Sequence, residues 1–299
     1  MRGCIQICAT MRWAAALLAA LATAAASRAT HVLVRNDTRP PARRCERDGA
    51  TYRCDPIAIF VGRGHTGSAN LAAFLSSHPD VTYGQTKEHR FFTRSRRPLD
   101  VGRYRREFPA SPSPASPPFG VDLTPEYGDR PGFKRVAGVI RDAVPDARIL
   151  IAVRRQPDLI MSKLYTPNGA AFDAWTNAHP PTARHAARFC HDGLVNAYVE
   201  AFGPSNVLVY SSEVLRMRRD DVLDDIFAFL GVAPFRTPLP VMHVCKAERY
   251  RGKFEGCYNG SSKVWPETRK RWEPVFAECN ARLARTLGVS EAELWGEVD

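Results

Sequence analysis

The fold is decided by the stretch Ile57-Ala58-Ile59-Phe60-Val61-Gly62-Arg63-Gly64-His65-Thr66-Gly67-Ser68. Five apolar residues lead here into a glycine-rich turn, which is typical of a parallel strand that is buried on both faces. A helical pattern follows the turn, with Leu71, Phe74 and Leu75 on one face. The stretch therefore predicts a strand, a turn and a helix in immediate succession.

Two further apolar runs, at residues 149–153 and 207–210, have the same strand-like character. Helix-period segments accompany them at residues 133–144, 158–164, 182–202 and 266–287. Strands that alternate with helices favour an α/β fold. We expect a single P-loop-like domain whose central parallel sheet is flanked by helices on both faces, with its ligand at the carboxyl ends of the strands.

The glycine-rich turn predicts an anion site, because its backbone N–H groups can curl around a phosphate and the next helix adds its own N–H groups. Gly62 and Gly67 have P-loop spacing, but Ser68 stands where an NTP-hydrolysing P-loop has lysine, which argues against a kinase or an NTPase. The plainer alternative is a turn that only joins a strand to a helix. The residues expected at the anion site are Arg63, Gly64, His65, Thr66, Gly67 and Ser68.

Composition excludes disorder and points to acidic partners. The chain has 299 residues, of which 44% are hydrophobic, and this is enough for a folded core. It carries 42 Lys and Arg residues against 31 Asp and Glu residues, a net charge of +11. Such an excess favours nucleic acid, anionic polysaccharide, phosphorylated or sulfated ligands, or a membrane surface. The charge alone does not choose among them.

The N-terminal residues predict entry into the secretory pathway. Arg2 and Arg12 precede an uncharged, alanine-rich run from Trp13 to Ala26. This run is short for a spanning helix, and a cleaved signal peptide and an uncleaved type II membrane anchor both remain open. We expect a signal segment at residues 1–28, a stem at 29–55 that is rich in Arg and Pro, and the folded domain at 56–299.

Glycosylation sequons and cysteines agree with an oxidising compartment. The sequons begin at Asn36 and Asn259. Six of the eight cysteines lie beyond the signal segment, an even number that suits disulfides. Each of two cysteine pairs brackets a short polar loop, so we expect the disulfides Cys45–Cys54 and Cys245–Cys257. No zinc site is expected, because no C-x2-C pair exists and the histidines lack ligand spacing.

The order and spacing of His65-Thr66-Gly67-Ser68 and His78-Pro79-Asp80-Val81 resemble sulfotransferases that use 3′-phosphoadenylyl sulfate, in particular the Golgi enzymes that sulfate heparan-type polysaccharides. In that family a K-x-G-T loop binds the 5′-phosphosulfate. His65 stands where the family has a lysine that stabilises the leaving oxygen. The resemblance therefore implies that His65 donates a hydrogen bond to the leaving group, with Arg63 as the alternative.

The segment Thr86 to Phe92 is similar to the family's K-E-x-H-F-F segment. The resemblance implies that Glu88 is the base that removes the acceptor's proton. Arg90 stands where the family has histidine, and we expect Arg90 and Arg94 to contact an acidic substrate. The segment around Leu123 resembles E-K-T-P-x-Y, with Leu123 in the place of a second lysine.

The second phosphate of the donor is expected on the strand that ends at Val153. The resemblance implies that Arg154 and Ser162 hold the 3′-phosphate, a task that suits the bidentate guanidinium. A different register would use Arg155. Near the C-terminus, Cys245 and Cys257 resemble the family's disulfide hairpin, and Lys263 falls in a similar loop over the nucleotide.

These expectations describe a sulfotransferase of the Golgi lumen or the secretory pathway, membrane-anchored or secreted. It would take 3′-phosphoadenylyl sulfate as donor, release adenosine 3′,5′-bisphosphate, and need no metal. The expected acceptor is a hydroxyl or amine of an acidic, glycosaminoglycan-like carbohydrate rather than nucleic acid, and a protein tyrosine is a further alternative. Two rivals stay open: a nucleotide-dependent kinase, and a non-catalytic polyanion-binding protein, which the absence of the two lysines favours.

Overall fold

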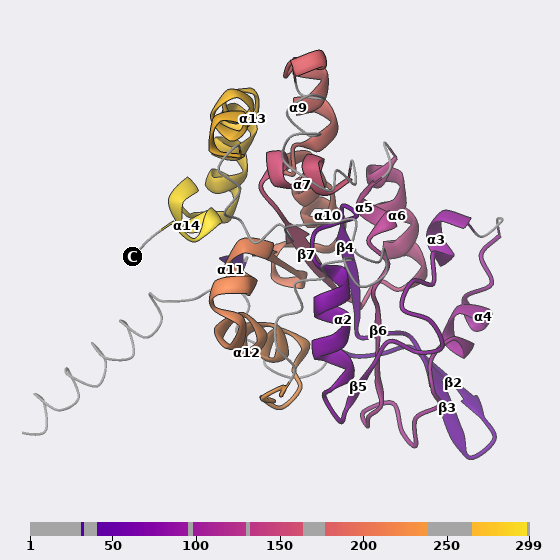
Figure 1. Cartoon of the computed structure of the whole chain (residues 1–299). Helices are drawn as coiled ribbons and strands as arrows, with labels where there is room; N and C mark the ends of the chain where they lie inside the picture. The colour runs from indigo at the N-terminus through magenta and orange to yellow at the C-terminus, as the bar shows by residue number, and fades with distance from the viewer. Residues whose placement is uncertain are drawn as a thin grey trace, which may run out of the picture.

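A six-stranded sheet in the order β1-β8-β7-β4-β6-β5 forms the centre of the computed structural model (Figure 1). The structure describes residues 31–32, 41–94, 98–129, 132–163, 177–238 and 265–297. Five neighbouring strands are parallel, and β1 pairs antiparallel with β8 at one edge. The strands are β1 (His31–Val32), β4 (Ala58–Gly62), β5 (Val81–Thr82), β6 (Phe119–Asp122), β7 (Arg148–Val153) and β8 (Val207–Ser211).

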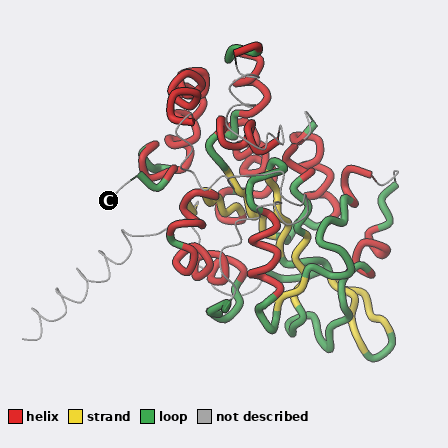
Figure 2. Tube along the Cα trace, viewed as in Figure 1, coloured by secondary structure: helices red, strands yellow, loops and turns green. Residues whose placement is uncertain are grey.

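Helices cover both faces of this sheet, as the red and yellow segments of Figure 2 show. Every residue of β4, β7 and β8 is buried, as expected for strands with helices on either side. The predicted α/β class is therefore confirmed. The helices are α2 (Ser68–Ser76), α3 (Phe91–Arg94), α4 (Val101–Arg106), α5 (Glu126–Asp129), α6 (Phe133–Ala143), α7 (Gln156–Lys163), α9 (Ala183–Phe189), α10 (Asp192–Phe202), η1 (Pro204–Asn206), α11 (Ser212–Met217), α12 (Arg219–Leu230), α13 (Trp265–Leu287) and α14 (Glu291–Trp295).

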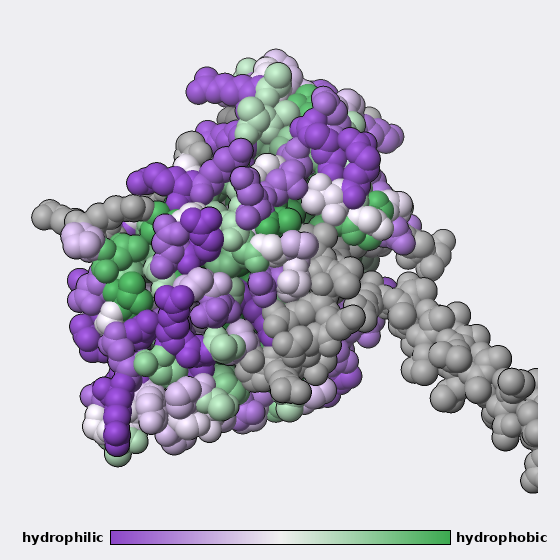
Figure 3. All heavy atoms as spheres, turned by 180° about the vertical axis from the view of Figure 1, so that it is seen from behind, coloured by the Kyte–Doolittle hydropathy of each residue, from purple (hydrophilic) through white to green (hydrophobic). Residues whose placement is uncertain are grey.

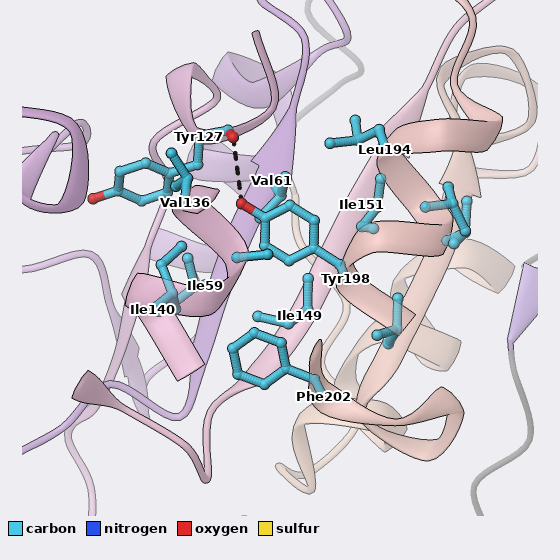
Figure 4. Packing of buried hydrophobic residues seen from close by; sticks show 14 of the residues in the cluster. Ile59, Val61, Tyr127, Val136, Ile140, Ile149, Ile151, Leu194, Tyr198 and Phe202 are labelled. Carbon is cyan, nitrogen blue, oxygen red and sulfur yellow. Dashed lines mark hydrogen bonds between the residues drawn. The ribbon is translucent and has the colours of Figure 1, made fainter. Parts of the chain in front are cut away.

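The alternation of side chains along each strand divides the core into two clusters. In β7, Ile149 and Ile151 pack with α6 and α10, while Leu150 and Ala152 pack with α2 and α12 on the other face. Figure 4 shows the first cluster, in which the hydroxyl of Tyr198 donates to the carbonyl of Tyr127 at 3.3 Å. The two helical layers hold the sheet from both sides and leave the carboxyl ends of the strands for a site.

Residues 45–54, within the predicted stem, form a hairpin of β2 (Cys45–Asp48) and β3 (Thr51–Cys54). The predicted Cys45–Cys54 disulfide joins its strands. Asp55 follows the hairpin, is 5% exposed, and accepts a hydrogen bond from Arg105 at 2.8 Å. Asp55 and Tyr52 thus contact Arg105 and Ser111 of the folded domain, and the stem boundary expected at residue 56 stays a prediction.

The helix expected over residues 182–202 is interrupted in the structure. Cys190 is extended between α9 and α10 and forms a disulfide with Cys279 of α13, a pairing that the sequence does not predict. This cross-link lies in a small third cluster, where Phe189 packs with Trp272 and Phe276. The interruption lets α9 join α13 while α10 remains on the sheet.

The surface is mostly hydrophilic where residues are described, and apolar colour on the face opposite Figure 1 is confined to small areas (Figure 3). Met217 is the one large hydrophobic side chain exposed among the described residues. None of the helices in the described ranges is long and apolar enough to span a membrane. The signal segment, both sequons, the Cys245–Cys257 pair and Lys263 lie outside the described residues.

Candidate functional site

The glycine-rich turn lies between β4 and α2, at the carboxyl ends of the parallel strands. His65 and Gly67 both have positive φ, at 75° and 89°, so the chain reverses sharply before α2 begins at Ser68. Glycine adopts this conformation without the steric cost that a side chain adds. The first turn of α2 contains no acidic residue. Its N–H groups and positive dipole end therefore suit an anion.

Side chains that follow two neighbouring strands form hydrogen bonds with the backbone of the turn. Ser212, directly after β8, donates from Oγ to the carbonyl of Thr66 at 2.6 Å and lies 3.0 Å from the carbonyl of Val153. Arg154, directly after β7, donates from Nη1 to the carbonyl of His65 at 2.7 Å. These contacts connect the turn to the ends of β7 and β8. Ser212 was not predicted from the sequence as a site residue. Its one signal in the sequence is a hydroxyl side chain at the end of a predicted strand.

Three predicted donor-site residues meet on one side of the turn. The Nδ1 atom of His65 lies 3.1 Å from Oγ of Ser162 on α7, and Arg154 holds the carbonyl of the same histidine. Arg155 lies elsewhere, with Nη1 3.3 Å from Glu273 of α13 and its guanidinium over the Trp295 ring. The geometry agrees with the register that uses Arg154, and the binding of a phosphate there stays a prediction.

An acid that the sequence did not single out contacts the turn, and a lysine pairs with that acid. The backbone N–H of Gly64 donates to Oδ2 of Asp129 at 3.2 Å, and the other carboxylate oxygen of Asp129 pairs with Lys163. Lys163 follows Ser162 on α7. A carboxylate on a loop N–H demonstrates that this backbone can bind an anionic oxygen. No sequence motif marks Asp129, since it reaches the turn from α5.

The Arg63 side chain, expected as the alternative to His65 at the leaving group, is directed away from the glycine-rich turn. Arg63 is 5% exposed, and its Nη2 donates to the carbonyl of Cys190 at 2.9 Å. Burial lowers the pKa of its guanidinium. The side chain therefore stabilises the α9–α10 junction behind the turn and is not directed at a ligand above it.

A buried histidine fixes the strand end that carries Arg154. His191 is fully buried and its Nε2 lies 2.8 Å from the carbonyl of Arg154. Burial, reinforced by the charge of Arg63, lowers the pKa of His191 to about 3. The ring is therefore neutral at physiological pH, and Nε2–H is the donor to the carbonyl. Sequence reasoning missed this residue, because a single histidine between helices has no motif.

On the other side of the turn, Glu88 lies between two cations. Its Oε1 is 2.8 Å from Nζ of Lys87 and its Oε2 is 2.6 Å from Nη2 of Arg90. Lys87 also donates to the hydroxyl of Ser68 at 3.2 Å. Burial acts to raise the pKa of Glu88, but the hydrogen bonds and charges of Lys87 and Arg90 hold it below the ordinary value. The carboxylate is thus ionised and connected to the turn through Lys87.

Arg90 is held beside Glu88 by its backbone as well as by its side chain. Its backbone is left-handed, at φ 55°, and its N–H donates to Oγ1 of Thr124 at 3.1 Å. Thr124 donates in turn to Asp122, a fully buried carboxylate whose other oxygen accepts from Tyr104 and Tyr127. The Arg90 guanidinium pairs with Glu88 and is 36% exposed, and its contact with an acidic substrate stays a prediction.

Two further predicted positions differ in exposure. Arg94 is exposed at the end of α3 and remains available to an acidic ligand. Leu123, in the place of the second family lysine, is fully buried in the core that α2 and α12 form. Apolar packing therefore explains why this position carries no charge here.

A cavity of about 630 Å³ lies between α7, α13 and α14. None of the turn residues lines it. Its polar walls bind one another: Gln156 donates to Asn280 at 2.6 Å, and Arg155 pairs with Glu273 and Glu297. We interpret it as a seam between helices and not as part of the site.

Comparison with known proteins locates this arrangement in a known fold. No protein-family model and no curated protein sequence matches the chain. The structure is similar to the crystal structure of a sulfotransferase from Alicyclobacillus acidocaldarius, with a TM-score of 0.52 and 23% sequence identity over 79% of this chain and 97% of that one. At this identity the likeness establishes architecture. The chain therefore shares its α/β fold with that bacterial sulfotransferase.

Proposed function

We propose that the chain transfers a sulfuryl group from 3′-phosphoadenylyl sulfate to an acceptor hydroxyl or amine. The observation that carries the proposal is the arrangement around one phosphate-type turn, with Arg154 and Ser162 on one side and Glu88 on the other. The shared fold of the bacterial sulfotransferase supports it. Neither support identifies the acceptor.

The donor's two phosphate positions match two groups of residues. The turn and the N-terminus of α2 offer N–H groups to the 5′-phosphosulfate. Arg154 and Ser162 offer a guanidinium and a hydroxyl to the 3′-phosphate, which is the group that separates this donor from ordinary adenine nucleotides. Lys263, which lies outside the described residues, is proposed to bind the same phosphate. The donor supplies an activated sulfuryl group, and the protein's task is to hold it and neutralise charge.

Glu88 is the proposed base. An acceptor hydroxyl gives its proton to Glu88 while its oxygen forms the new bond to sulfur and the bond from sulfur to the bridging oxygen breaks. Adenosine 3′,5′-bisphosphate then leaves with the bridging oxygen. The reaction needs no metal in this account, since cationic side chains provide the charge.

The proposed acceptor is an acidic carbohydrate of the glycosaminoglycan type. The net charge of +11 and the exposed Arg94 near the base segment support an anionic polymer. The Cys45–Cys54 and Cys190–Cys279 disulfides support an oxidising compartment such as the Golgi lumen. A protein tyrosine is the acceptor against which the carbohydrate must be tested.

The test combines binding and transfer. Calorimetry with the purified chain should show that it binds adenosine 3′,5′-bisphosphate with an affinity at least tenfold higher than its affinity for adenosine 5′-monophosphate. Incubation with donor labelled on sulfate should then label a polysaccharide and not a tyrosine peptide. Label on the peptide alone would overturn the carbohydrate acceptor. Heparin binding without bisphosphate binding would instead favour a non-catalytic polyanion-binding protein. His65 and Leu123, which stand where the resembling family has lysine, are the observations that favour this rival.

A further inference from the structure

The predicted transfer site lacks a cation at both positions where the resembling family has lysine. His65 directs Nδ1 toward Ser162 on α7, the side of the predicted 3′-phosphate. Leu123 is fully buried in the apolar core. If the chain transfers a sulfuryl group, the charge that develops on the transferring group and the leaving oxygen must be met by another residue.

Lys87 has the position that this role requires. Its Nζ lies 3.2 Å from the hydroxyl of Ser68, the first residue of α2, and 2.8 Å from Oε1 of Glu88. The ammonium group thus lies between the end of the anion-binding turn and the proposed base. Its side chain is 29% exposed, so solvent and ligand can reach it.

The other cations around the turn are directed elsewhere in the described part of the chain. Arg63 is buried on the carbonyl of Cys190, and Lys163 pairs with Asp129 beneath the loop. Arg154 holds the carbonyl of His65, and Arg90 pairs with Glu88 and lies 3.4 Å from Glu126. Within the described residues, Lys87 alone contacts both the start of α2 and the proposed base.

We propose that Lys87 binds the sulfuryl group in transit and the bridging oxygen, and that His65 and Ser162 together orient the phosphate side of the donor. This assignment rests on the proposed function. An ammonium group has three N–H donors. Lys87 can therefore keep its contacts with Ser68 and Glu88 and direct the third N–H at a sulfuryl oxygen. The step transfers no proton to or from Lys87: the acceptor proton goes to Glu88, and the electron pair of the broken sulfur–oxygen bond stays on the bisphosphate.

Lys87→Gln, Lys87→Arg and His65→Ala test this division of roles in the full chain, with Lys134→Gln as the control. Lys134 is an exposed lysine of α6 whose loss removes the same charge from the surface. We expect K87Q to lower kcat by about 10²- to 10³-fold, the range for loss of one group that stabilises transition-state charge. Its affinity for adenosine 3′,5′-bisphosphate, which keeps the bridging oxygen but lacks the sulfuryl group, should fall by a smaller factor than kcat does. K87R should recover part of kcat. H65A should mainly lower the affinity for the bisphosphate.

The pH profile separates direct action from an effect through Glu88. Lys87 helps to lower the pKa of Glu88, so a lysine that only tuned the base would shift the acid limb of kcat/KM upward on replacement and the loss would disappear at higher pH. A lysine on the sulfuryl group predicts a loss that persists at every pH. Recovery at high pH overturns the proposal, as does wild-type turnover in K87Q. A wild-type chain that binds bisphosphate but transfers no label overturns the proposed function together with it.

Discussion

Arg154 donates a hydrogen bond from Nη1 to the carbonyl oxygen of His65 at 2.7 Å, and so the end of β7 fixes the left-handed residue of the glycine-rich turn. The same hydrogen bond holds the Arg154 guanidinium at the turn, close to the contact between His65 and Ser162. Arg154 therefore has a structural partner and a position from which its remaining N–H groups can reach a phosphate. The adjacent Arg155 has neither relationship.

Replacement of Arg154 by alanine should lower the affinity for adenosine 3′,5′-bisphosphate by about 10- to 100-fold, since a hydrogen bond to a charged group contributes about 1.5–3 kcal/mol. Arg155→Ala is the matched control, because that side chain lies on Glu273 and Trp295. It should lower the melting temperature and leave the affinity unchanged. Calorimetry and thermal unfolding measure the two effects. Loss of affinity in R155A but not in R154A would establish the other register.

Replacement of Glu88 by glutamine should lower turnover by about 10²- to 10⁴-fold, the usual contribution of a positioned general base. Bisphosphate affinity should remain, because among the described residues Glu88 is linked to the turn through Lys87 and not directly. Glu278→Gln on the exposed side of α13 is the control, since the Glu278 carboxylate is exposed and pairs with Arg282 in a surface contact. Labelled-sulfate transfer under single-turnover conditions is the measurement. Equal rates in E88Q and E278Q would remove Glu88 from the reaction.

His191 should make the folded state sensitive to acid. Its pKa is about 3 in the folded chain, because of burial and the nearby charge of Arg63, against about 6.5 in an unfolded chain. Between these values the unfolded state binds the extra proton, so stability falls as pH falls, by at most about 1.4 kcal/mol per pH unit. Above pH 7 the histidine is neutral in both states and contributes no slope.

His191→Gln should flatten this dependence in urea unfolding measured at several pH values between 4 and 7. Asp122 and Glu213 act in the opposite direction, because burial raises the pKa of each carboxyl. Their contribution is common to both proteins and cancels in the difference. A slope unchanged by the substitution would mean that His191 titrates normally in the folded chain.

The Cys190–Cys279 disulfide should stabilise the fold more than Cys45–Cys54. Its cysteines are 89 residues apart in sequence, against 9 for the hairpin pair. Loop-closure entropy gives upper values of about 4–5 and about 3 kcal/mol for loops of these sizes. Urea unfolding of the two double alanine variants, C190A/C279A and C45A/C54A, should therefore show the larger loss for the first. An equal or reversed order would show that strain or residual structure in the unfolded chain dominates.

The sequence predicted the parts of the fold that follow from local pattern. The apolar runs at 57–61, 149–153 and 207–210 correspond to β4, β7 and β8, because strands buried on both faces need continuous apolar residues. The short strands β5 and β6 lack such runs and were missed. The break between α9 and α10 was missed as well, since a disulfide to Cys279 holds Cys190 extended within an otherwise helical pattern.

Sequence alone determined the α/β order, the glycine-rich turn and the residue types beside it, because backbone conformation and burial periodicity are local properties of the chain. Tertiary structure decided which side chains reach that turn. Arg63 is part of the turn yet is buried behind it, whereas Asp129 and Ser212 contact it from distant segments. The direction of a side chain depends on which elements the sheet topology brings to one edge, and a linear pattern does not contain that information.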